Sequence, residues 1–221
     1  MADNTILKDN AGSGGSATSI QKWGATASFL MAVALIVAPL VYLTGNLDDT
    51  GGPVVYALAD FLYGPVWAAG LMTAVYALRE RLGERAPRLM TLALLVALVA
   101  AGAFVTVASI RSANRYYHLT HPDLNLENST IVLTVWSTLL AGMIGAAWHF
   151  LGWVFLLVGT AGWTSGRLPH VLSALYVAAG FAALFVYLLP TLEGTAVLLG
   201  TVVSIWQGLL LWKVDPEASR T

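Results

Sequence analysis

Six apolar stretches dominate this sequence, and each is long enough to cross a lipid bilayer as a helix. A hydrocarbon core of about 30 Å requires about 20 apolar residues in an α-helix. Because lipid offers no hydrogen-bond partner, a crossing segment must pair its own backbone groups. Runs rich in Leu, Val and Ala without two-residue alternation do this as helices. We therefore predict an all-α polytopic membrane protein, a bundle of six transmembrane helices at residues 25–45, 53–78, 88–110, 143–163, 168–190 and 194–213.

The composition agrees with a chain embedded in lipid. Hydrophobic residues make up 57% of the 221 residues and charged residues 10%, whereas an ordinary soluble domain has roughly 25% charged residues. We expect a transmembrane domain over 25–213, a disordered cytoplasmic tail over 1–24 and a short cytoplasmic tail over 214–221. The chain has no cysteine, which excludes disulfides and thiolate metal sites. Its net charge of −1 gives no sign of a nucleic-acid partner, so the lipid bilayer is the expected partner.

Basic residues are distributed unevenly between the two faces of the predicted bundle. Short loops rich in Lys and Arg stay on the cytoplasmic side of a membrane. One face carries Lys8, Lys22, Arg79, Arg81, Arg85, Arg88, Arg167, Lys213 and Arg220, together with both chain ends. The other face carries only Arg111 and Arg115. Both termini are therefore predicted to be cytoplasmic.

Two segments depart from simple straight spans. Residues 129–163 form an apolar run longer than one crossing needs, and we expect a short amphipathic helix at the outer interface over 129–141, followed by span four. The alternative is one long tilted helix that projects outward. In span two, Gly64-Pro65 is the clearest candidate for a kink.

Ionisable residues inside apolar spans mark candidate functional positions, because each costs a few kcal/mol or more in lipid. Asp60 lies in span two, Arg111 ends span three, and His149 lies in span four. All three fall in the outer third of the predicted membrane. We expect a buried Asp60–Arg111 ion pair with His149 nearby. The alternative interpretation is a purely structural pair that holds two helices in register.

Aromatic residues accompany these three polar residues at helical spacing on spans two and four. A few polar anchors among aromatic side chains are typical of a small-molecule pocket. The predicted ligand-binding set is Asp60, Arg111, His149, Tyr56, Tyr63, Trp67, Trp148 and Trp153.

No catalytic residue, cofactor or metal is predicted. His118, His121 and Asp123 are suitable metal-ligand types, but a His-x-x-His pair in a loop is a weak signal. Haem ligation by two histidines requires one of these loop histidines to fold down onto His149.

Several short motifs carry a resemblance to a known family. They are Arg111 closing span three, Trp148-His149-Phe150 with Gly152 in span four, the link Arg167-Leu168-Pro169, and Trp206-Gln207-Gly208-Leu209 in span six. With the long external segment before span four, the chain over 25–213 resembles an uncharacterised bacterial family of six-span membrane proteins, known as domain of unknown function 4386. The resemblance implies this topology in the bacterial cytoplasmic membrane, and it implies no activity.

The leading functional hypothesis is an integral membrane protein that binds or passes a small molecule, lipid or ion through the outer pocket. The alternative is an accessory or structural subunit of a membrane complex or homo-oligomer, because glycines in span four offer a close contact surface. The third hypothesis, an intramembrane lipid-modifying enzyme, requires a second acid or base beside Asp60 and His149. Tyr56, Tyr63 and Glu193 are the candidates for that role, and we lean towards a protein that is not an enzyme.

Overall fold

The computed structural model of the chain describes residues 13–44, 52–120 and 130–213. Within these ranges the backbone is helical almost throughout and contains no strand, which confirms the predicted all-α class. The elements are α1 (Ser13–Thr44), α2 (Gly52–Phe61), the π-helical segment η2 (Leu62–Val66), α3 (Trp67–Leu82), α4 (Pro87–Thr120), α5 (Thr130–Ser165), α6 (His170–Phe185), the 3₁₀ segment η4 (Pro190–Leu192) and α7 (Glu193–Trp212).

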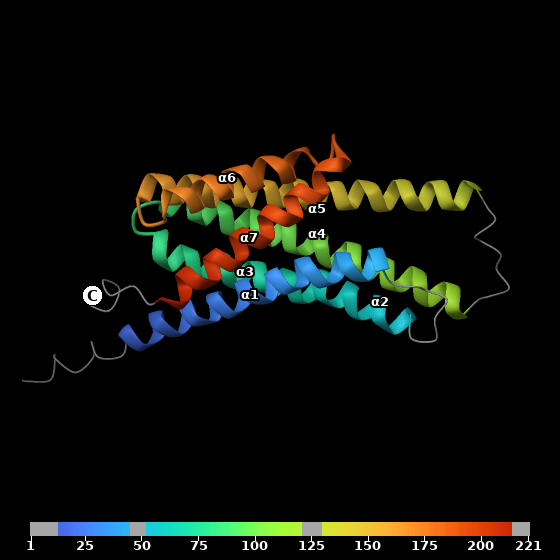
Figure 1. Ribbon diagram of the computed structural model, residues 1–221, viewed down its shortest axis with the longest axis horizontal. Helices are drawn as coiled ribbons and strands as arrows, with labels where there is room; N and C mark the ends of the chain where they lie inside the picture. The colour runs from blue at the N-terminus through green and yellow to red at the C-terminus, as the bar shows by residue number, and fades with distance from the viewer. Residues whose placement is uncertain (1–12, 45–51, 121–129, 214–221) are drawn as a thin grey trace, which may run out of the picture.

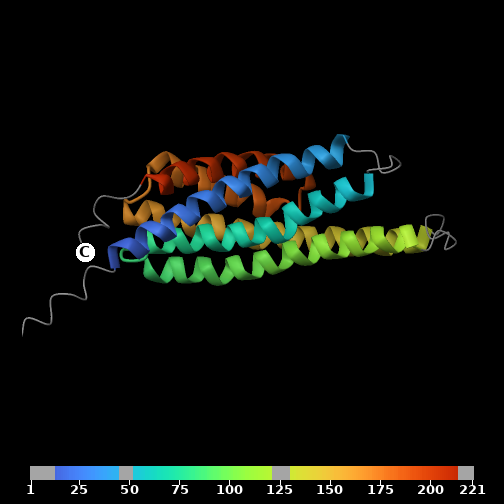
Figure 2. The same ribbon diagram turned by 90° about the horizontal axis from the view of Figure 1, so that it is seen from below.

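The helices lie side by side along the longest axis of the molecule (Figure 1). The start of α1, the end of α7 and the α3–α4 and α5–α6 turns share one end. We call it the basic end, because it carries Lys22, Arg85, Arg167 and Lys213. At the opposite end, which we call the far end, α4 and α5 continue past the other helices (Figure 2). The basic links and the described chain ends therefore lie together, as the charge distribution predicts.

Among the described residues, five helical segments are long and apolar enough to cross a membrane. They are Ser19–Thr44, Val54–Leu82, Pro87–Tyr116, Thr134–Ser165 and Pro190–Trp212. The sixth predicted span, at 168–190, contains α6, which is apolar but only 16 residues long. Large apolar side chains such as Leu40, Leu95 and Leu198 are exposed along the sides of the bundle. Such surfaces are rare in water-soluble monomers, so these helices indicate a multi-pass membrane protein.

The α5 helix runs without a break from Thr130 to Ser165, over 36 residues. The expected separate interfacial helix over 129–141 is therefore wrong for the described residues 130–141, and the alternative of one long helix is correct. No proline interrupts this segment. A Cβ added at Gly142 would meet no atom within 4 Å, so no neighbouring element forces a bend there.

The α1 helix begins at Ser13, so residues 13–24 are helical and the expected disordered tail over 1–24 is too long. Gln21 is buried. Gly24 lies so close to α3 that an added Cβ would come within 2.2 Å of the Ala77 Cβ. Residues 1–12 and the second predicted tail, 214–221, lie outside the described residues.

The predicted break at Gly64-Pro65 is confirmed, because both residues belong to the π-helical segment η2. Proline lacks the N–H that the helix would use at that position, and π-turns accommodate such a lost hydrogen bond. Figure 2 shows α2 leaving the axis of α3 at this point. Gly64 permits close contact with α4, since an added Cβ would lie 2.3 Å from the Ala108 Cβ. The η2 segment thereby sets the position of α2 against α4.

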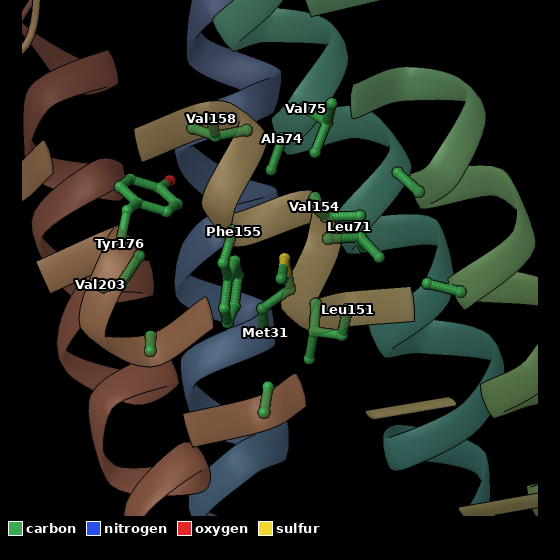
Figure 3. Packing of buried hydrophobic residues seen from close by; sticks show 14 of the residues in the cluster. Met31, Leu71, Ala74, Val75, Leu151, Val154, Phe155, Val158, Tyr176 and Val203 are labelled. Atoms are coloured by element: carbon green, nitrogen blue, oxygen red, sulfur yellow. The ribbon is translucent and has the colours of Figure 1, made fainter. Parts of the chain in front are cut away.

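Small residues set the spacing between the helices, as expected where packing rather than water exclusion drives helix association. A Cβ added at Gly152 of α5 would lie 2.8 Å from the Gly180 carbonyl oxygen of α6. Gly145 faces the ring of Tyr187 in the same interface. Figure 3 shows Phe155 of α5 packed among side chains from α1, α6 and α7, and its ring centre lies 5.7 Å from that of Tyr176. Gly145 and Gly152, considered for a subunit contact, are therefore used in packing within the chain.

Arginines tie the helix ends together at the basic end. Arg85 donates to the Ser165 carbonyl at 3.0 Å, and Arg81 donates to the Leu210 carbonyl at 3.2 Å. The last carbonyls of a helix lack an intrahelical donor and carry partial negative charge. The arginines near the α3–α4 turn therefore stabilise the C-terminal ends of α5 and α7.

Candidate functional site

Asp60 of α2 is a buried carboxylate with 1% of its surface exposed. Tyr42 of α1 donates its hydroxyl to Oδ1. Oδ2 accepts hydrogen bonds from Arg115 at 3.1 Å and from Ser112 at 3.4 Å, both on α4. A buried charge is tolerated when it is paired and hydrogen-bonded in this way. We call Asp60, Tyr42, Ser112 and Arg115 the Asp60 cluster, and it links α1, α2 and α4.

The expected Asp60–Arg111 ion pair is wrong, because the partner of Asp60 is Arg115. Positions i and i+4 share a helix face, so the sequence spacing does not distinguish the two arginines. The Arg111 guanidinium lies 5.1 Å from the ring centre of Tyr42, and that of Arg115 lies 4.9 Å from the ring centre of Tyr56. Both are cation–π contacts. Arg111 forms no ion pair with a carboxylate in the described part of the chain.

A cavity of about 460 Å³ lies beside the Asp60 cluster and is partly open to the surface. Its volume falls in the usual range for small-molecule sites. Most of its lining residues are apolar or aromatic, and the polar or charged side chains among them belong to two tyrosines, one arginine and one glutamate. We call it the main cavity. Its lining residues are Pro39, Tyr42, Leu43, Tyr63, Phe104, Val107, Arg111, Ile144, Ala147, Pro190, Glu193, Gly194 and Val197.

The main cavity contains one positive and one negative side chain that do not pair with each other. Glu193 is the first residue of α7, where the helix dipole favours a negative charge. One of its oxygens accepts a hydrogen bond from the Trp148 indole N–H at 3.2 Å. Within the described residues Glu193, like Arg111, has no ion-pair partner. Both charges therefore remain available to a bound molecule.

A second cavity, of about 230 Å³, borders the Asp60 cluster directly. Asp60 and Ser112 line it, together with Phe61 and Pro65. Tyr42 lines the main cavity and donates to Asp60, so their hydrogen bond lies between the two cavities.

His149 does not join this site. It is exposed on α5, and its Nε2 accepts a hydrogen bond from the Trp153 indole N–H at 3.2 Å. The neighbouring Trp148 packs edge-on against Phe104, which precedes Arg111 by seven residues on α4. Seven helical residues correspond to about 10 Å along the helix axis. His149, next to Trp148, therefore lies about 10 Å nearer the basic end than Arg111 does. The expectation that His149 lies beside Asp60 is wrong, and Trp153 lies outside the cavity with it.

Phe104 gathers three of the predicted aromatic residues beneath the main cavity. Its ring centre lies 5.4 Å from that of Tyr63, 4.5 Å from that of Trp67 and 5.7 Å from that of Trp148. Of these three, only Tyr63 lines the cavity. Trp67 and Trp148 are almost fully buried and support its floor. Tyr56, also predicted, packs against Tyr42 at 5.7 Å, behind the cavity wall.

The described residues contain no group of three side chains suited to hold a metal ion. The loop candidates His121 and Asp123, and the side chain of His118, lie outside the described part of the chain. Asp60 and His149 do not lie together, so the acid–base arrangement considered for an enzyme is not assembled from them.

No protein-family model, curated protein or solved structure matches this chain. The resemblance to the uncharacterised six-span family therefore stays a prediction.

The Asp60 cluster gives opposite predictions for two arginines on one helix face. Arg115→Gln removes the charge that compensates buried Asp60 and is expected to lower the free energy of unfolding by about 3 kcal/mol. Arg111→Gln removes a cation–π contact with Tyr42 and no ion pair among the described residues, and it is expected to cost about 1 kcal/mol or less. Denaturant titration in detergent, followed by circular dichroism, measures both.

Equal losses for the two variants would contradict this assignment. The double variant Asp60→Asn/Arg115→Gln serves as the control. If the two residues are coupled, its loss in free energy of unfolding is smaller than the sum of the losses of the two single variants.

Proposed function

We propose that this chain is a six-span protein of the bacterial cytoplasmic membrane, with both termini cytoplasmic, that binds a small amphiphilic molecule or lipid in the main cavity. Passage of this molecule from one side of the membrane to the other is an extension of this proposal.

The sixth crossing is supported by the residues that follow α6. The helix itself accounts for about 24 Å at 1.5 Å per residue. The next residues, Tyr187, Leu188 and Leu189, are apolar or aromatic and all exposed. Exposed apolar side chains at this place fit contact with lipid, and they extend the apolar length towards the 30 Å or so of a bilayer core.

The depth of the main cavity follows from helix lengths. Asp60 lies 19 residues from Arg79, and Glu193 lies 19 residues from Trp212. Each separation corresponds to about 28 Å along a helix, close to one hydrocarbon thickness. Trp23, Trp163 and Trp212 are exposed near the basic end, where tryptophan favours the membrane interface. With the basic end at the inner interface, the cavity lies at the outer boundary of the hydrocarbon.

One observation carries the proposal: in a largely apolar cavity at this depth, the Arg111 guanidinium and the Glu193 carboxylate form no ion pair with any described residue. Unpaired charges near lipid are costly, and an amphiphile satisfies such a site because its polar group meets the charges while its apolar part fills the rest. The carboxylate of Asp60 already interacts with the other three members of the Asp60 cluster, so we assign it a structural role.

A subunit role is the second candidate, favoured by the part of α5 that continues past the shorter helices at the far end. Ile131, Val135 and Leu139 are exposed there at four-residue spacing and form one apolar stripe. Such a stripe fits contact with a second membrane protein or a second copy of this chain.

The proposed orientation predicts which side of the membrane two introduced cysteines face. The chain has no cysteine of its own, so single substitutions give a clean signal. In intact bacterial cells, a membrane-impermeant maleimide is expected to label Thr191→Cys and to leave Glu84→Cys unlabelled until the cells are permeabilised. Protection of Thr191→Cys in intact cells would contradict the sixth crossing, and labelling of Glu84→Cys would contradict the orientation.

The proposed binding function predicts that filling the main cavity removes a retained molecule. Val197 lines the cavity, whereas its neighbour Leu198 is 64% exposed on the outside of α7. Native mass spectrometry of gently purified protein is expected to show a bound mass on the wild type and on the Leu198→Trp control, and none on Val197→Trp. A bound mass on all three proteins, or on none, would count against the cavity as the site. An unliganded, defined oligomer would favour the subunit role.

A further inference from the structure

The charges of the main cavity identify the headgroup that it fits. We infer that the bound molecule is a zwitterionic amphiphile whose head carries an ammonium and a phosphate, with the phosphate at Arg111 and the ammonium at Glu193. This inference rests on the proposed binding function and adds the chemical class of the ligand.

The phosphate end of the head is matched by Arg111. A guanidinium presents five N–H donors in a planar fork that suits phosphate oxygens. Tyr42 holds this group through its ring, 5.1 Å from the guanidinium carbon, and the Tyr42 hydroxyl is already engaged by Asp60. Arg111 therefore has a fixed position, a free charge and no competing carboxylate among the described residues.

The ammonium end of the head is matched by Glu193. Glu193 is the first residue of α7, at the positive end of the helix dipole. The Trp148 N–H donates to one of its carboxylate oxygens, and no side chain of the described residues donates to the other. A primary ammonium donates up to three hydrogen bonds and carries the complementary charge.

A head with a single charge satisfies only half of this arrangement. An anionic head pairs with Arg111 but meets like-charge repulsion from Glu193, and a cationic head has the reverse problem. A head with both charges leaves neither side chain unpaired at the edge of a low-dielectric region. Phosphoethanolamine has this chemistry, whether as a lipid head or as the free compound. The apolar wall of Phe104, Ile144 and Val197 favours the lipid, whose acyl chain covers it.

The test compares two lipids that share a phosphate and differ in the ammonium. Delipidated full-length protein in mild detergent is titrated with dioleoyl phosphatidylethanolamine or dioleoyl phosphatidylglycerol, and native mass spectrometry counts the bound lipid. The wild type is expected to retain the ethanolamine lipid about tenfold better, the ratio that corresponds to one charge-assisted hydrogen bond. Soluble phosphoethanolamine is added as a competitor in a separate series.

The variants separate the two charges. Glu193→Gln is expected to weaken the ethanolamine lipid about tenfold and to abolish the preference, because the ethanolamine lipid loses its ammonium partner whereas the glycerol lipid loses only a repulsion. Arg111→Gln is expected to weaken both lipids. Glu84→Gln removes a carboxylate at the basic end, where Glu84 pairs with Arg167, and is expected to change neither. Unchanged melting temperatures show that the variants are folded.

The outcomes distinguish this inference from the proposed function. Retention of both lipids with a ratio that Glu193→Gln leaves unchanged would overturn the zwitterion and leave the binding cavity intact. If the wild type retains neither lipid, the lipid inference is overturned. If the gently purified wild type carries no bound molecule at all, the proposed function is overturned. Displacement by an equal concentration of soluble phosphoethanolamine would support the headgroup chemistry but overturn the amphiphile, because the free compound has no apolar part. No displacement supports the lipid.

Discussion

Charge compensation around Asp60 is the constraint on which the far end of the bundle depends. A carboxylate buried among apolar helices needs a cation and hydrogen-bond donors. Arg115 supplies the cation from α4, and Tyr42 supplies a hydroxyl from α1. The π-helical segment η2 lets α2 turn so that Asp60 reaches both. Three helices are thus fixed by one side chain, at a level where lipid packing alone would leave their relative rotation weakly determined.

The candidate site follows from this arrangement in two steps. Asp60 engages the hydroxyl of Tyr42 and so orients its ring, and that ring supports the guanidinium of Arg111 beside the main cavity. Because Asp60 pairs with Arg115, Arg111 has no carboxylate partner in the part of the chain that the structure describes. Glu193, held by Trp148 at the start of α7, provides the opposite charge on the same cavity. The Asp60 cluster therefore has a structural role, and Arg111 and Glu193 are the proposed binding groups of the main cavity.

Sequence reasoning predicted the all-α class, the basic end and the break at Gly64-Pro65, because length, hydropathy and local backbone chemistry determine them. It also singled out Asp60 and Arg111 by the cost of burying charge. It assigned the wrong arginine to Asp60, because residues 111 and 115 lie on one helix face and only the packing of α2 against α4 separates them. It placed His149 in the pocket from its depth alone, although rotation of α5 turns that side chain outwards. Tyr42 was not predicted, since a tyrosine near a span end has an ordinary interfacial role. Glu193 was considered only as an acid or base for an enzyme and was not in the predicted ligand-binding set.

A crystal structure of the wild-type protein, from crystals grown in a lipid mesophase, tests the central claim most directly. The account predicts elongated density in the main cavity, with its polar end between Arg111 and Glu193 and its apolar part along Phe104. A collapsed cavity in which Arg111 and Glu193 pair with each other would contradict the account, because no charge would then remain for a ligand.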